Sequence, residues 1–174
     1  MKAIFNRRSV RKFKTGEITN EVVKQLLQAA MRAPSALNEQ PWEFIVIRNR
    51  QTLAHVMKIH PYATMLNEAD CMILICGNTE LQKSPYDFWV QDCSAATQNL
   101  LLQATHLGLG SVWLGIYPIE ERVIGIQKCF GLPKHVIPLC GVALGYPAVE
   151  PKGIDTYCKD KVHIETWSKK QNKE

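Results

Sequence analysis

Apolar residues recur along the chain at two spacings, which predict helices alternating with short strands. Helical spacing runs from Val22 to Ala30, where Thr19 or Asn20 can cap the start and Pro34 marks the end. Further helices are predicted over residues 51–58, 87–107 and 118–128. Short apolar runs predict buried strands over residues 44–47, 71–76, 111–116 and 136–145.

The helical pattern over residues 87–107 is the longest, and its apolar stripe spreads over two adjacent faces. This breadth indicates burial against more than one neighbour, and a second copy of the chain is one candidate. The residues that follow the last predicted strand show no core pattern. A tail of this kind often needs a partner surface.

Composition indicates an ordinary folded protein. The 174 residues are 46% hydrophobic and 21% charged, which suits one compact domain over residues 1–174 and excludes a disordered chain. No apolar run approaches the roughly 20 residues of a membrane-spanning helix, and the N-terminus lacks the pattern of a secretory signal. We therefore expect no membrane contact and a cytoplasmic location.

The six cysteines and five histidines form no metal-binding or disulfide pattern. No CxxC or HExxH motif occurs, and the five-residue offset of His55 and His60 does not put them on one helical face. Most cysteines lie in apolar runs, so we expect reduced, buried thiols and no metal site.

Positive charge is concentrated at the N-terminus. The first 14 residues hold six of the 21 basic residues and no acid, whereas the rest of the chain has 15 basic and 16 acidic residues. Arg7, Arg8, Ser9 and Arg11 combine planar guanidinium donors with a hydroxyl, a set that suits the oxygens of one phosphate group. A solvated charge run is the alternative. A nucleic-acid surface is disfavoured because such surfaces spread wider and include aromatic residues.

A polar loop bounded by prolines is the second candidate site. Ser35, Asn38 and Gln40 offer donors and acceptors for the edge of a heterocycle or for a ribityl chain. Pro41 fixes the backbone, and Trp42 is expected to anchor the loop in the core. A plain turn remains the alternative.

The glycine-rich segment from Gly108 to Gly115 is the third candidate. Its order of helix then strand, with Trp113 at the third glycine position, excludes the dinucleotide fingerprint GxGxxG. Gly115, at the end of the predicted strand, could instead let a backbone N–H approach a planar cofactor closely.

In this order, the three segments resemble the nitroreductase family of enzymes that bind flavin mononucleotide (FMN). The first matching element is Arg7-Arg8-Ser9-x-Arg11, and the second is Pro34-Ser35-x-x-Asn38-x-Gln40-Pro41-Trp42. Other matching residues are Trp89, Asp92, Ala96 and Asn99, then Gly108-Leu109-Gly110, Gly145-Tyr146-Pro147 and Lys161-Val162-His163-x-x-x-Trp167. The resemblance implies an α+β fold, with a central, mostly antiparallel sheet flanked by helices, and an intertwined homodimer with two FMN sites at its interface.

The resemblance also implies roles for the three segments. Arg7, Arg8, Ser9 and Arg11 would contact the phosphate and the pyrimidine side of the flavin. Pro34, Ser35, Ala36 and Asn38 would come from the other subunit. Trp113, Leu114 and Gly115 would line the isoalloxazine ring near N5. One feature departs from many relatives, because Ile154-Asp155-Thr156 stands where they carry a basic residue for the phosphate, and Lys152 or Lys159 is the candidate replacement.

The activity implied is NAD(P)H-dependent reduction of a small organic acceptor, such as a nitroaromatic compound or a quinone, by ping-pong hydride transfer through FMN. No catalytic side chain is expected, because the flavin carries the chemistry and a backbone donor at Leu114 or Gly115 tunes it. A specialised member of the superfamily is an alternative, with a flavin-destructase-like, dehalogenase-like or semialdehyde-reductase-like activity. A non-catalytic flavin-binding dimer and a nucleic-acid-binding dimer are others. The residues do not distinguish NADH from NADPH.

Overall fold

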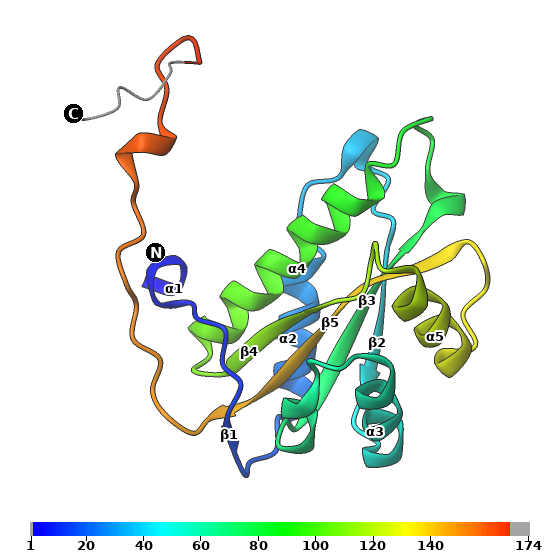
Figure 1. Ribbon diagram of the computed structural model, residues 1–174, viewed down its shortest axis with the longest axis vertical. Coiled ribbons are helices and arrows are strands. Elements are labelled where there is room, and N and C mark those ends of the chain that lie inside the picture. Colours follow the sequence, from blue (N-terminus) through cyan, green and yellow to red (C-terminus); the bar gives the residue numbers. More distant parts are fainter. Residues whose placement is uncertain (1, 168–174) are drawn as a thin grey trace.

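The strand β5 (Val136–Pro147) is the centre of the sheet in the computed structural model, which describes residues 2–167 (Figure 1). One edge of β5 pairs with β3 (Cys71–Asn78), which in turn pairs with β2 (Trp42–Ile47). The other edge pairs with β4 (Gly110–Gly115) and with the two-residue strand β1 (Phe13–Lys14). All four pairings are antiparallel, so the predicted type of sheet is confirmed.

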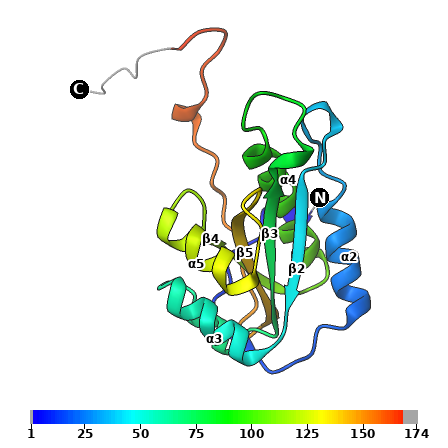
Figure 2. The ribbon, with the colours of Figure 1, turned by 90° about the vertical axis from the view of Figure 1, so that its right-hand side faces the viewer.

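Helices cover both faces of this sheet (Figure 2). On one face lie α2 (Asn20–Ala30) and α4 (Trp89–His106), and on the other lie α3 (Arg50–Ile59) and α5 (Glu120–Phe130). Side chains of β3 alternate between the two cores: Ile73 and Ile75 pack with the first pair of helices, and Met72 and Leu74 with the second. Burial on both faces explains why this strand is a continuous apolar run.

The predicted helix signals hold with small shifts at the ends. Thr19 caps α2, since its hydroxyl accepts a hydrogen bond from the N–H of Val22 at 3.3 Å. The helices α4 and α5 each begin two residues later than predicted, at Trp89 and Glu120. The broad stripe of α4 is buried against α2 and the sheet, as its pattern predicted.

Two elements carry no recognisable sequence signal. The helix α1 (Lys2–Asn6) has no buried residue and therefore no apolar stripe, and β1 is too short to alternate. Short 3₁₀ turns are found at Ala36–Asn38, Thr64–Asn67, Thr79–Leu81 and Lys159–Lys161.

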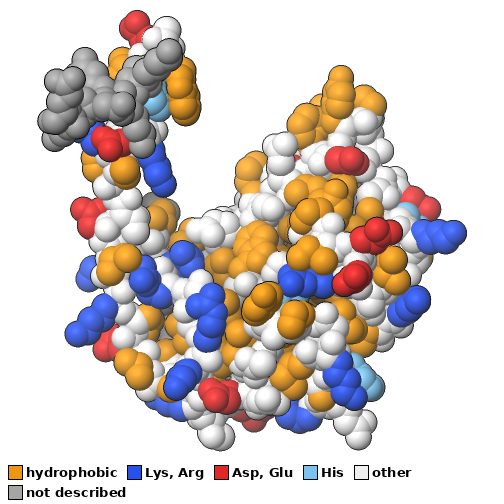
Figure 3. All heavy atoms as spheres, in the orientation of Figure 1, with side chains coloured by type: hydrophobic (Ala, Val, Ile, Leu, Met, Phe, Trp, Pro, Cys, Tyr) orange, Lys and Arg blue, Asp and Glu red, His pale blue; other side chains and the backbone are white. Residues whose placement is uncertain are grey.

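The chain beyond β5 leaves the body of the protein. Residues 148–167 run past α1 and then extend away from the helices and the sheet (Figures 1 and 3). The tail exposes several large apolar side chains: Val149, Ile154, Tyr157, Val162, Ile164 and Trp167. Within residues 2–167, no helix is both long and apolar enough to cross a membrane.

Candidate functional site

The basic N-terminal segment lies along the outer edge of β4. Ser9 forms a parallel bridge with Ser111, and the N–H of Val10 donates to the Ser111 carbonyl at 2.9 Å. This approach needs a glycine at position 110, because a Cβ there would lie 2.8 Å from Val10. The fold thus brings the predicted phosphate-binding residues beside the strand that carries Trp113–Gly115.

The basic side chains of this segment are open to an anion. Arg7 and Arg8 are half-buried and Arg11 is exposed. Among the residues that the structure describes, none forms an ion pair or a side-chain hydrogen bond with these three guanidinium groups. Figure 3 shows basic side chains gathered on this side of the molecule, around the N-terminal segment and the start of the tail.

The pairing of β4 decides which of its backbone groups face outward. The N–H of Ile116 donates to Leu139 on β5, so alternate residues of β4 point their backbone groups toward β5. Leu114 belongs to that set, and its side chain is buried under α3 and α5. Trp113 and Gly115 belong to the other set, and their N–H groups face the outer edge.

At position 115, neither the backbone conformation nor the packing of the chain requires a glycine. Its φ lies outside the left-handed region, and a Cβ added there would meet no atom within 4 Å. Each of the other nine glycines either has a positive φ or would bring a Cβ within 3.0 Å of a neighbour. The open space beside Gly115 lies over a face of the sheet at the end of β4 and leaves this strand end accessible to a flat molecule from outside the chain, so the site fits the predicted flavin.

Two side chains converge on the carbonyl of Gly115. Arg122 Nη1 donates to this oxygen at 2.8 Å, and His60 Nε2 lies 2.9 Å from it. The N–H of Tyr62 donates to Nδ1 of His60 at 3.3 Å, which leaves the ring proton on Nε2. Burial, and then the charge of Arg122, lower the pKa of His60, so the imidazole is neutral at pH 7. Neither residue is among the predicted site residues, and in the sequence His60 is only a histidine without metal-ligand spacing.

The Pro34–Gln40 loop has a strained backbone. Leu37, Asn38 and Gln40 have φ values of 50°, 54° and 49°. This left-handed conformation costs a residue such as leucine roughly 1–2 kcal/mol, and strain of this kind is concentrated at functional sites. Ser35 and Asn38 hold the turn, since Ser35 Oγ accepts from the Gln40 N–H at 3.0 Å and Asn38 Oδ1 from the Gln40 side chain at 3.2 Å.

Two buried carboxyl groups support this loop. Asp92 Oδ1 accepts from the N–H of Ala36 at 3.0 Å, and Glu39 Oε1 accepts from the N–H groups of Lys83 and Ser84 at 2.6 and 2.8 Å. The second oxygen of each carboxyl group is buried without a partner among the described residues. In the sequence, Asp92 is only one residue of the family pattern, although an acid inside the apolar stripe of α4 was a signal of a buried carboxyl group. Glu39 is not among the predicted site residues. Trp42 is buried, as predicted.

Within one chain, the loop and the basic segment lie at opposite ends of α4. The loop contacts Asp92, in the first turn of this helix, whereas α1 packs beside Leu102 and His106, near its other end. Asp92 and His106 are 14 positions apart, which is roughly 20 Å along a helix. Within one chain, the structure therefore brings the basic segment to β4 at Ser111 and leaves the loop apart from that basic segment.

The residues considered for a late phosphate contact lie in the tail. Residue 153 passes so close to α1 that a Cβ there would lie 2.5 Å from the carbonyl oxygen of Phe5. Lys152, Thr156 and Lys159 are all exposed. Lys152 therefore lies in the part of the tail that runs beside the N-terminal segment.

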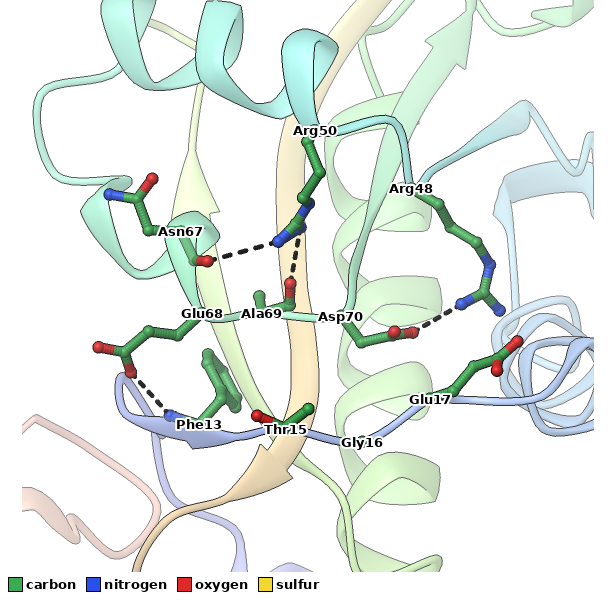
Figure 4. A pocket seen from close by; sticks show the side chains of 10 residues that line it. All are labelled: Phe13, Thr15, Gly16, Glu17, Arg48, Arg50, Asn67, Glu68, Ala69 and Asp70. Carbon is green, nitrogen blue, oxygen red and sulfur yellow. Dashed lines mark hydrogen bonds and ion pairs between the residues drawn. The ribbon is translucent and has the colours of Figure 1, made fainter.

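A separate hollow of about 720 Å³ lies where the segment after β1 meets β3 (Figure 4). Its arginines are engaged within the chain, because Arg48 pairs with Asp70 at 2.6 Å and Arg50 donates to the Ala69 carbonyl at 2.7 Å. The N–H of Ile18 also donates to Asp70, at 3.2 Å. These contacts tie the N-terminal segment to the sheet.

Thiols and metal ligands do not form a site in residues 2–167. All six cysteines are free and four are buried, as predicted, and burial raises the pKa of Cys71, Cys76 and Cys140 to about 12. Such thiols stay protonated and are poor nucleophiles. No group of three or more His, Cys, Asp or Glu residues in this range is placed to hold a metal ion.

Comparisons with known proteins identify the family and the fold of the chain. Residues 4–146 match the model of the Nitroreductase family. A Methanothermobacter thermautotrophicus protein, provisionally named NADH dehydrogenase/NAD(P)H nitroreductase, is 48% identical over 96% of this chain and 87% of its own length. The crystal structure of a provisionally named NADH oxidase from Clostridium acetobutylicum has a TM-score of 0.91 at 42% identity, covering 95% of this chain and 99% of that one. A provisionally named nitroreductase from Desulfovibrio desulfuricans, solved in complex with FMN, has a TM-score of 0.81 at 28% identity and covers 96% of both chains.

Proposed function

Because this chain belongs to the nitroreductase family, we propose that it is an FMN-dependent NAD(P)H oxidoreductase that reduces a small organic acceptor. The observation that carries the proposal is the open space beside Gly115, at the end of a strand whose outer edge borders the basic N-terminal segment at Ser111. The FMN complex of the Desulfovibrio desulfuricans relative and the NAD(P)H in the names of relatives support the choice of cofactor and reductant.

In this proposal the protein binds and orients the flavin. The guanidinium groups of Arg7, Arg8 and Arg11 and the hydroxyl of Ser9 hold the phosphate and the pyrimidine side. FMN held there would supply hydride transfer through N5 between NAD(P)H and the acceptor, in a ping-pong cycle. The N–H of Gly115 faces the open edge and serves as the backbone donor near N5, a role for which Leu114 is directed the wrong way.

The complete site requires a second copy of the chain. The loop residues Pro34, Ser35, Ala36, Asn38 and Gln40 reach the flavin from the partner, since within one chain they lie at the far end of α4 from the basic segment. The exposed apolar side chains of the tail support the same homodimer, because such surfaces mark interfaces.

An anaerobic spectral titration tests the proposal. Purified protein is loaded with FMN, desalted, and titrated with NADH or NADPH, after which nitroaromatic and quinone acceptors are added. We expect retained flavin absorbance that the nicotinamide cofactor bleaches and an acceptor restores. A protein that retains no FMN would refute the assignment, and a flavin that NAD(P)H fails to bleach would favour a non-catalytic flavin-binding dimer.

A further inference from the structure

The Gly115 carbonyl has more partners than a carbonyl at a strand end needs. One hydrogen bond, from protein or water, is enough for such a group. Here a guanidinium group from the first turn of α5 and a buried imidazole from the end of α3 both reach it, at 2.8 and 2.9 Å. The imidazole is 4% exposed, so the chain buries a polar ring to make this contact.

These two side chains restrain the strand end at a residue that has no side chain of its own to pack. Glycine has the widest conformational freedom of any residue, and no packed side chain limits Gly115. Holding its carbonyl fixes the orientation of the strand end. The N–H of the same residue faces the outer edge of β4, where the flavin is proposed to lie.

The same contacts put one positive charge beside the open space. The guanidinium carbon of Arg122 lies 5.8 Å from the centre of the Tyr62 ring, a cation–π contact that keeps the side chain in place. The imidazole is neutral, so Arg122 is the cation of this cluster. A cation at this position favours negative charge that develops nearby.

We propose that Arg122 and His60 are positioning residues of the flavin site: they fix the Gly115 backbone, and Arg122 supplies a positive charge that favours reduction of the bound flavin. The inference rests on the proposed function, because it concerns the edge assigned to FMN.

The test compares the two-electron midpoint potential of FMN in the holoenzyme of wild type, Arg122→Gln and Arg122→Lys. Lys128→Gln is the matched control, since it removes the same charge from an exposed position on the same helix. Arg122→Gln removes the positive charge that favours the reduced flavin, and a roughly tenfold change in the reduction equilibrium lowers the two-electron potential by about 30 mV. Arg122→Lys should retain most of the wild-type value.

A second measurement tests, without flavin, whether Arg122 and His60 hold the Gly115 backbone. Hydrogen exchange of residues 113–117 should be faster in flavin-free Arg122→Gln and His60→Ala than in wild type, and unchanged in Lys128→Gln. If Arg122→Gln does not fold, Arg122→Met, whose unbranched side chain fills a similar space, takes its place.

The outcomes separate the two proposals. A wild-type protein that binds no FMN overturns both. Wild-type protein that binds FMN and is bleached by NAD(P)H, combined with equal potentials in Arg122→Gln and Lys128→Gln, overturns the positioning role alone. Unchanged exchange in both Arg122→Gln and His60→Ala would also overturn it.

Discussion

Gly115 is the residue at which the flavin proposal meets its most direct test. Gly115→Val adds a side chain to space that is open in the chain and suits a strand, so we expect unfolding temperatures within about 2 °C of wild type. Forcing atoms into an occupied contact costs about 1–3 kcal/mol, which should weaken FMN binding by about 5- to 150-fold. Fluorescence titration of flavin-free protein measures this loss. Equal FMN affinity in the variant and wild type would contradict the placement of the flavin at this edge.

Arg7 and Arg11 are predicted to hold the flavin phosphate. Removing one charge-assisted contact costs about 1.5–3 kcal/mol, so Arg7→Ala and Arg11→Ala should each weaken FMN binding roughly 10- to 100-fold. Lys12→Ala removes the same charge from the same segment and serves as the control. The loss should be larger for FMN than for riboflavin, which lacks the phosphate. Full FMN occupancy in both arginine variants would exclude these residues as the phosphate site.

At the scale of elements, the junction between α4 and the Pro34–Gln40 loop depends on Asp92. Burial raises the pKa of this carboxyl group, the hydrogen bond from Ala36 opposes the shift, and the charge of Glu39 adds to it. The folded state therefore holds the proton more tightly than the unfolded chain does. Stability falls as pH rises from the ordinary aspartate pKa of about 4 through the raised value.

Asp92→Asn removes this penalty while its carbonyl still accepts from Ala36. We expect the variant to unfold roughly 2–4 °C above wild type at pH 7, with the difference disappearing below about pH 4. Calorimetry across this pH range measures the effect. Asp87→Asn, at an exposed position just before α4, should behave like wild type. Identical unfolding temperatures for Asp92→Asn and wild type at pH 7 would show that the buried carboxylate carries no penalty.

The elements that could be predicted from the sequence are those whose own residues determine their structure. The cap at Thr19 and the apolar runs of β3 and β5 fix structure within about a dozen residues. The unpredicted α1 and β1 exist because they lie against distant residues, as where Phe13 pairs with Pro147 on β5. The strained turn at Leu37 and Gln40 was equally invisible, because residue type does not report φ.

At the scale of the whole molecule, one part of the candidate site could be predicted from the sequence and another part could not. The arginine cluster and Gly115 were predictable from residue types together with a family resemblance. The contacts of His60 and Arg122 with Gly115 could not be predicted from the sequence. They bring together the end of α3, the start of α5 and the end of β4, and these elements become neighbours only in the folded chain. Which chain supplies the Pro34–Gln40 loop also depends on assembly rather than on local sequence.

The tail is predicted to pack on a second copy of the chain. Ile154 and Ile164 are 58% and 78% exposed, and apolar groups this open indicate an interface. The double variant Ile154→Asp, Ile164→Asp would bury two charges at this interface, which should weaken dimerisation roughly 100-fold. In sedimentation experiments, this variant should dissociate at concentrations at which the wild type is a dimer. Ile124→Asp, an exposed position on α5, is the control. A monomeric wild type would contradict the prediction.

Whether two chains share each flavin site can be decided by mixing two defective variants. Arg7→Ala damages the basic segment, and Asn38→Asp damages the loop with a residue that tolerates its left-handed backbone. If the two parts come from different subunits, a mixed dimer holds one intact site and one doubly damaged site. Random pairing then restores roughly a quarter of the sites, measured as FMN bound after coexpression of the two chains. If both parts came from one chain, every site would keep one defect and mixing would restore nothing.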